Sequence, residues 1–359
     1  MSSQSVYEWG PQVIAAMSRR RSLPWFFALA PVLAGAPVFA QDVLEPILKS
    51  GTISGRQRAT MEAELSQRIK RFAEAGANES RRVEARDRLI RPAQAKGASK
   101  AGLDAYAEIC ADELRPVVTN PLFDLAQDAL HILSALDNAN TAPAYAAALE
   151  SSNAAIRLIA ARGIQSLHKK LADRQSACED VLAALGRAGA AERNEHVLRV
   201  IYQAVNFPAA VPKFKYADAA AAALNTIFAS RLQQLAGGSR DERRDVLGWA
   251  AATDCYGGAG VDQKALLMRN MAGFLQTIVD RFFDPDTGEE AYPALAAAAD
   301  QIEKVIYELM KASKVPPPTQ RVAARLKGRI SDRNKARSEV QADLKALMAI
   351  LQKDPWNLS

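Results

Sequence analysis

Few residues of this 359-residue chain have the types and spacing that would support chemistry. The three histidines, His131, His168 and His196, lie far apart, and none belongs to the HExxH pattern of a zinc hydrolase. The sequence also lacks the GxSxG elbow of serine hydrolases and the glycine-rich loop that holds phosphates. The residues therefore predict neither a catalytic centre nor a cofactor site.

The best candidate for a metal site is the acidic loop 283–290, FDPDTGEE. Oxygen ligands from Asp284, Asp286 and Glu289 around Gly288 could hold Ca²⁺, although their spacing departs from the twelve-residue EF-hand loop. The same residues also describe a simple turn followed by a helix with acidic first residues, which suits the helix dipole. We predict no metal and keep the three acidic residues as weak candidates.

Three cysteines, Cys110, Cys178 and Cys255, are spaced too widely for a zinc site or a small disulfide scaffold. In an oxidising compartment one pair could form a disulfide and leave one thiol over. Alternatively, all three are buried as small apolar residues. Cys255 lies in an unusual loop, 254–258, and is a weak candidate for a reactive thiol because no basic residue is near it in the sequence.

The first forty residues have the pattern of a secretory leader. Arginines at 19–21 precede an apolar run at 23–35, which is shorter than the about 20 residues that span a bilayer. Val38 and Ala40 are compact residues at the −3 and −1 positions, so we expect cleavage after Ala40 and a true start at Met17. An uncleaved anchor is the alternative. This pattern predicts an exported protein of the periplasm or the extracellular space.

The charge pattern favours a soluble protein rather than a nucleic-acid binder. The net charge is +6, of which about +4 remains without the leader. Between Arg56 and Arg91, charges of both signs alternate at helical spacing, which is typical of exposed helices with ion pairs from position i to i+4. An anionic glycan, lipid or protein is the alternative partner of this stretch. Export and the absence of interleaved aromatic residues argue against nucleic acid.

These candidate residues must be positioned by helices. Apolar residues recur every three or four positions almost throughout the chain after Val43, and alternating β-branched runs are absent. Glycines and prolines interrupt this pattern at helix-length intervals, which predicts roughly a dozen helices joined by short turns. The chain is therefore predicted to be all-α, and no membrane span is expected after the leader.

The same apolar face recurs in three consecutive helical hairpins between about 120 and 206, and the first two hairpins are 34 residues apart. In the central hairpin, at 143–167, the second helix begins at Asn153. It carries one apolar face made of Ile156, Ala160, Ile164 and Leu167. The same face recurs before and after it, at Leu122, Ala126, Leu130 and Leu133, and at Val197, Ile201 and Val205.

The run from Asn153 through Ile156 and Arg157 to Leu167 resembles the second helix of a HEAT repeat. The resemblance covers about 120–206, and Phe123 stands where that family would place its arginine. It implies a HEAT-like α-solenoid, in which stacked antiparallel hairpins share one core and offer an extended surface to a partner. It also implies binding or scaffolding rather than catalysis. An irregular multi-helix bundle is the alternative fold.

The sequence divides into five segments. Residues 207–216 contain two prolines and are predicted to be a linker or long turn. A charged helix is predicted from Thr319 to Lys353, either capping the stack or pairing with another helix as a coiled coil. The segments are a leader at 1–40, a charged helical region at 41–118, HEAT-like hairpins at 119–207, a C-terminal helical region at 208–315, and a proline hinge with the charged helix at 316–359.

Together these patterns predict an exported, non-catalytic protein-binding or scaffolding protein of the bacterial cell envelope. Its expected partner is another envelope protein, and self-association through the C-terminal helix is an alternative. A rival from another class is an envelope enzyme that acts on glycan or peptidoglycan. Such an enzyme needs two carboxylates that converge in one cleft, and spacing alone identifies no such pair.

Overall fold

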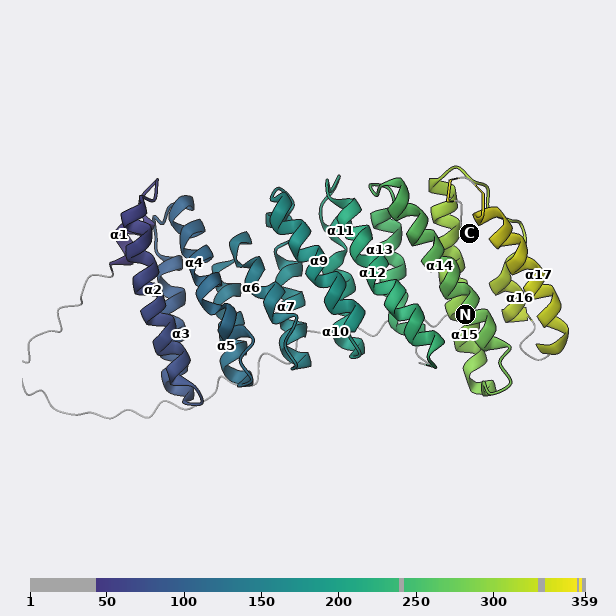
Figure 1. The fold of residues 1–359 in the computed structure, drawn as a ribbon, viewed down its shortest axis with the longest axis horizontal. Helices are drawn as coiled ribbons and strands as arrows, with labels where there is room; N and C mark the ends of the chain where they lie inside the picture. Colours follow the sequence, from purple (N-terminus) through teal and green to yellow (C-terminus); the bar gives the residue numbers. More distant parts are fainter. Residues whose placement is uncertain (1–42, 239–241, 329–332, 354, 357–359) are drawn as a thin grey trace, which may run out of the picture. The chain divides into compact units, whose positions relative to one another are not determined.

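The computed structural model describes residues 43–238, 242–328, 333–353 and 355–356. The leader, with its predicted start at Met17 and its cleavage site at Ala40, lies outside the described residues. The described chain contains seventeen α-helices, four short 3₁₀-helices and no strand (Figure 1). The all-α prediction is confirmed. None of the helices in these residues combines the length and the apolar composition that crossing a membrane requires.

The helices vary widely in length, and short ones alternate with long ones. The α-helices are α1 (Leu44–Leu48), α2 (Gly55–Ala75), α3 (Glu79–Ile90), α4 (Lys100–Val118), α5 (Phe123–Leu136), α6 (Ala142–Ala148), α7 (Ala154–Ser166), α8 (His168–Leu171), α9 (Gln175–Ala191), α10 (Glu195–Val205), α11 (Phe207–Ala210), α12 (Ala217–Ala236), α13 (Val246–Tyr256), α14 (Val261–Phe282), α15 (Tyr292–Ala312), α16 (Val322–Gly328) and α17 (Arg333–Leu351). The 3₁₀-helices are η1 (Arg91–Gln94), η2 (Ala139–Thr141), η3 (Glu242–Asp245) and η4 (Glu289–Ala291).

Most of the long helices are arranged as hairpins in two layers. Consecutive helices pair, and each then packs on the corresponding helix of the next hairpin. One layer holds α2, α4, α6, α9, α12 and α14, and the other holds α3, α5, α7, α10, α13 and α15. Figure 1 shows these hairpins following one another in chain order. Each hairpin therefore buries its apolar residues both between its own two helices and against the neighbouring hairpins.

The apolar positions that recur in the three hairpins lie in this shared core. Leu122 is the exception: it is 37% exposed because it occupies the N-cap position before α5. Asn153 and Asn194 cap α7 and α10, with side-chain oxygens that accept hydrogen bonds from the backbone N–H groups of Ala155 and His196. The buried members are Ala126, Leu130, Leu133, Ile156, Ala160, Ile164, Leu167, Val197, Ile201 and Val205.

Two glycines allow neighbouring helices to approach closely. A Cβ atom on Gly163 of α7 would overlap the ring of Tyr145 from α6. A Cβ atom on Gly248 of α13 would lie 2.5 Å from Cε1 of Tyr202 from α10. Only hydrogen fits at these two positions without movement of a buried aromatic ring.

The segment at 207–216 is packed into the core rather than extended as a linker. It contains the short helix α11, and both Phe207 and Phe214 are buried. Their rings stack with centroids 5.1 Å apart, and the ring of His168 lies 4.0 Å from that of Phe207. Of the two predicted alternatives, burial argues against a linker, whereas the bend and turns at 211–216 agree with a long turn.

The charged C-terminal segment forms two helices instead of the single one predicted from Thr319 to Lys353. Helices α16 and α17 pack on each other, and Arg325 of α16 forms ion pairs with Glu339 and Asp343 of α17. Helical periodicity does not reveal where one helix ends and the chain reverses direction. The predicted length of this helix was therefore wrong. The apolar residues Val322, Leu326, Val340, Leu344, Leu347 and Leu351 of this segment are buried, and Ile330 lies outside the described residues.

Candidate binding site beside the Arg157–Glu192 bridge

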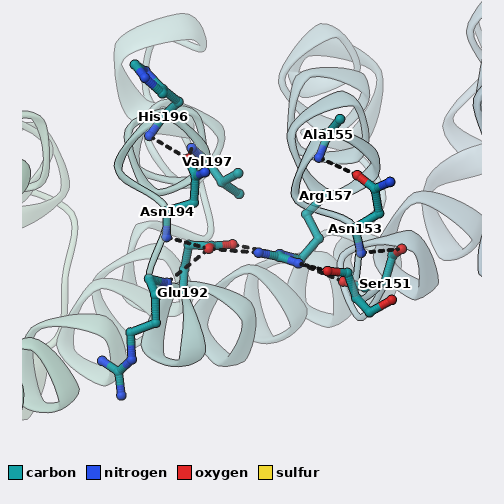
Figure 2. Close-up of polar contacts among 10 residues, drawn as sticks. Ser151, Asn153, Ala155, Arg157, Glu192, Asn194, His196 and Val197 are labelled. Atoms are coloured by element: carbon teal, nitrogen blue, oxygen red, sulfur yellow. Dashed lines mark hydrogen bonds and ion pairs between the residues drawn. The ribbon is translucent and has the colours of Figure 1, made fainter. Parts of the chain in front are cut away.

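The arginine of the HEAT-like motif joins two hairpins. Arg157 lies in the first turn of α7, and its Nε and Nη2 donate hydrogen bonds to the two carboxylate oxygens of Glu192 at 2.7 and 2.9 Å (Figure 2). Its Nη1 donates to the backbone oxygens of Ser151 and Ser152 at 2.8 and 3.0 Å. One guanidinium therefore ties the loop before α7 to the loop before α10.

Glu192 is the buried partner, with a side chain that is 1% exposed. Its carboxylate also accepts hydrogen bonds from the backbone N–H groups of Arg193 and Asn194 at 2.9 and 2.8 Å. Burial opposes ionisation, but the hydrogen bonds from Arg157 and the backbone outweigh it, and the pKa of Glu192 lies below its ordinary value. The hydrogen bond to Glu192 in turn raises the pKa of Arg157.

A hollow of about 410 Å³ opens beside this bridge, and we call it the arginine hollow. Its apolar floor comes from Leu149, at the end of α6, and from Ala184, Ala188 and Ala191 on α9. Helix α6 has seven residues and α9 has seventeen, so α9 is longer by about 15 Å. The C-terminal half of α9 therefore extends past the end of α6. Its alanine side chains leave the resulting space open.

The rim of the arginine hollow carries charged groups that are not used by the fold. Arg187 and Arg193 are exposed, and neither guanidinium forms an ion pair or hydrogen bond with any residue in the described part of the chain. Glu150 also lines the hollow and is exposed. The site thus offers two guanidinium groups and one carboxylate above an apolar floor.

A second hollow, of about 520 Å³, lies between the loops that precede α6 and α9, and we call it the loop hollow. Asp104, Asp137 and Asp173 all line it. The structure therefore brings together several carboxylates that sequence spacing did not connect, as the enzyme alternative requires.

Two of these carboxylates are already engaged. Asp137 forms an ion pair with Lys170, and Asp104 lies 3.7 Å from Arg174 and accepts a hydrogen bond from the Nδ2 group of Asn138 at 2.8 Å. The contacts of Lys170 with Asp137 and of Asn138 with Asp104 join residues that are 33 and 34 positions apart in the chain, so they connect successive hairpins. The geometry is that of a structural polar network between hairpins.

The acidic loop proposed as a metal site is folded as a turn. The side-chain oxygen of Asp284 accepts a hydrogen bond from the N–H group of Asp286 at 3.0 Å, and Glu289 begins η4, which leads into α15. In the part of the chain that the structure describes, no three His, Cys, Asp or Glu residues are grouped closely enough to hold a metal ion. The loop therefore has the turn geometry that was the simpler of its two interpretations.

The three histidines are not brought together into one centre. His131 and His196 are exposed, whereas His168 is buried with its Nε2 atom 2.8 Å from the backbone oxygen of Ala204. Burial lowers the pKa of His168, which therefore favours the neutral form and acts as a core residue.

The three cysteines are free thiols and all are buried. Burial raises the pKa of Cys178 and of Cys255 to about 12. A thiol with so high a pKa is a poor nucleophile at neutral pH. The structure therefore contains small buried cysteines and no disulfide between them. Cys255 lies in the last turn of α13, and Gly257 and Gly258 form the turn that follows this helix.

Sequence reasoning identified Arg157 but missed Glu192, which completes the bridge. The sequence signal that could have identified Glu192 was an acidic residue two positions before the N-cap Asn194, in the turn between α9 and α10. In the charged region 56–91, sequence reasoning likewise predicted the local contacts and missed a contact between hairpins. Its predicted i,i+4 pairs are present, but Arg82 is buried and reaches Asp128 of the next hairpin at 2.5 Å.

Comparison with known proteins does not place this chain in a family. No family model and no curated protein matches it. One solved structure, reported under the words "Computational Design of Self-Assembling Cyclic Protein Homooligomers", is similar over 83% of this chain and 96% of its own, with 13% identity and a TM-score of 0.22. A TM-score that low carries no argument about fold or assembly.

Proposed function

We propose that this protein is an exported, non-catalytic protein-binding or scaffolding protein of the bacterial cell envelope, built as a HEAT-like α-solenoid. The observation that carries the proposal is the arginine hollow, whose charged rim and apolar floor are left over after the hairpins have packed. A site of this kind suits recognition of a partner because it combines apolar area with unpaired guanidinium groups.

The lining of the hollow supports binding rather than covalent chemistry. Ser151 is the only hydroxyl-bearing residue among those that line it, and its Oγ accepts a hydrogen bond from the N–H group of Asn153 at 3.2 Å. No histidine lines the hollow to take a proton from Ser151. The groups left for a partner are Arg187, Arg193 and Glu150, which make ion pairs and hydrogen bonds.

Export is supported by the sequence of the leader. The arginines at 19–21, the short apolar run at 23–35 and the compact residues before Gln41 occur in the order that secretion signals require. The HEAT-like arrangement is supported by the 34-residue spacing of buried positions and by the contacts between successive hairpins. Proteins stacked in this way bind partners along an extended surface.

Site-specific photo-crosslinking in living cells tests this function. A benzoylphenylalanine residue is placed at Ala191, which lines the arginine hollow, and in a control at Gln203, which is exposed on α10 of the other layer. We expect a discrete adduct with an envelope protein at Ala191 and none at Gln203. Finding the protein in the cytosolic fraction, or finding no adduct at Ala191 in the exported protein, would contradict the proposal.

A second candidate function, an envelope enzyme that acts on glycan, is favoured by the three carboxylates of the loop hollow. Purified protein incubated with peptidoglycan would then release soluble fragments, and Asp173→Asn would abolish the release because Asp173 is exposed and is the member of the set without an ion pair among the described residues. We expect no release, since ion pairs with Lys170 and Arg174 engage the other two carboxylates.

A further inference from the structure

We infer that the arginine hollow binds the C-terminal residue of a partner chain, with its α-carboxylate between Arg187 and Arg193 and its aliphatic side chain on the alanine floor. The inference rests on the proposed function, because it names the chemistry that the partner presents to this site. The evidence for this inference is that one hollow is lined both by free guanidinium groups and by small apolar side chains.

The charged rim selects a carboxylate. A guanidinium presents a planar set of N–H donors that matches the two oxygens of a carboxylate, and such charge-assisted bonds are stronger than neutral ones. Arg157 is already engaged by the fold, because four of its five N–H donors bond to Glu192 and to two backbone oxygens. Arg187 and Arg193 have no such partners among the described residues and remain available to a ligand.

The apolar floor separates a chain terminus from an acidic side chain. In a C-terminal residue the carboxylate and the side chain leave the same Cα atom, so one residue can contact the arginine rim and the floor together. An aspartate or glutamate carries its carboxylate at the tip and has no apolar group beyond it. The floor of Leu149, Ala184 and Ala188 would then contact nothing.

The size and the remaining charge fit the end of a peptide. The volume of about 410 Å³ lies near the lower limit of ordinary ligand pockets, which suits one or two residues rather than a helix. Glu150 lines the same hollow and can accept a hydrogen bond from a backbone N–H group of the incoming chain. The hollow can therefore contact the terminal carboxylate, the terminal side chain and the backbone of a bound peptide.

Binding of short peptides to the purified protein tests the inference. The probe is a fluorescein-labelled peptide, Gly-Ser-Gly-Ala-Leu, with a free C-terminus, and binding is followed by fluorescence anisotropy. The first control is the same labelled peptide with an amidated end, and the second is labelled, amidated Gly-Glu-Gly-Ala-Leu, in which the only carboxylate of the peptide is on a side chain. We expect both controls to bind about tenfold more weakly or worse, because the terminal charge-assisted bonds are lost.

Matched variants connect this binding to the hollow. Arg187→Gln and Arg193→Gln should each weaken binding of the free peptide about tenfold, whereas Arg199→Gln, an exposed arginine on α10, should leave it unchanged. Ala188→Phe should fill the hollow and abolish binding, while Ala183→Phe, on the exposed side of the same helix, should not. Circular dichroism establishes that each variant is folded.

Several results would overturn the inference. These are equal affinity for the free and amidated peptides, tighter binding of the glutamate peptide, insensitivity to Arg187→Gln, or no binding by any peptide ending in Ala, Val, Leu or Ile. If a crosslinked partner at Ala191 persists in such a case, the proposed function stands and only the terminal-carboxylate chemistry fails. Loss of the adduct itself would instead contradict the proposed function.

Discussion

Arg157 and Glu192 lie 35 residues apart in the chain, and their side chains form a two-point ion pair across neighbouring hairpins. Their bridge fixes the loop before α7 to the loop before α10, and the arginine hollow opens directly beside it. The contact is therefore both a structural link and a wall of the candidate site.

Replacing Arg157 by methionine should destabilise the protein by about 2–4 kcal/mol, because it leaves the buried carboxylate of Glu192 without its cation. The double variant Arg157→Met, Glu192→Gln should recover most of this loss, since glutamine is uncharged and still accepts the backbone N–H bonds. Urea denaturation measures both. Arg162→Met, an exposed arginine on the same helix, should change stability by less than about 0.5 kcal/mol.

Acid should weaken the protein partly through Glu192. Because its pKa is lower in the folded protein than the ordinary value of 4.5, its ionisation adds stability at every pH above that value. This contribution is lost as the pH falls from 4.5 through the lower folded pKa. Urea denaturation from pH 7 to pH 3 should show a shallower acid decline for Glu192→Gln than for the wild type. Parallel curves below pH 4.5 would exclude this role.

A buried polar cluster joins three helices further along the chain. The hydroxyl of Tyr202 donates to Asp245 at 2.6 Å, and Arg231 donates to both oxygens of the same carboxylate. Tyr202→Phe should cost about 1–2 kcal/mol, because it removes one hydrogen bond to a charged group and leaves the ion pair intact. Tyr216→Phe, a half-buried tyrosine, serves as the control and should be nearly neutral in thermal unfolding.

Close packing around the same tyrosine predicts that Gly248→Ala is harmful. The added methyl group would lie 2.5 Å from Tyr202 and 2.8 Å from Phe228, so a buried ring must move. The expected loss is about 1–3 kcal/mol by urea denaturation. Gly257→Ala is the matched control, because no atom lies within 4 Å of its added Cβ and its φ is helical. That variant should be neutral or slightly stabilised.

Trp356 follows α17 and is buried. Its Nε1 donates to the hydroxyl of Tyr256 at 2.6 Å, and that oxygen lies 2.5 Å from Oγ of Ser313. Trp356→Ala should release the terminal residues and increase their cleavage by carboxypeptidase about tenfold or more, because local opening becomes easier. Lys353→Ala, at an exposed position, should not. Equal cleavage of both variants would show that Trp356 does not hold the chain end.

Periodicity and capping residues were sufficient to predict the all-α class and most of the core. The recurring apolar positions around Ile156 are buried as expected, apart from Leu122 at the N-cap of α5. They could be predicted because burial repeats with the helical period, which is a local property of the sequence. The N-cap at Asn153 was predictable for the same reason, since a side-chain cap needs only neighbouring residues.

Contacts between distant residues required the tertiary structure. The sequence alone did not pair Arg157 with Glu192 or Arg82 with Asp128, because each pair depends on how one hairpin is rotated against the next. The return of α17 onto α16, and the burial of Phe207 and Phe214, have the same origin. The arginine hollow depends on tertiary structure most of all, because it exists only where the short α6 packs beside the longer α9. The sequence by itself determined the helices and their apolar faces, while packing decided which polar groups meet and which stay free for a partner.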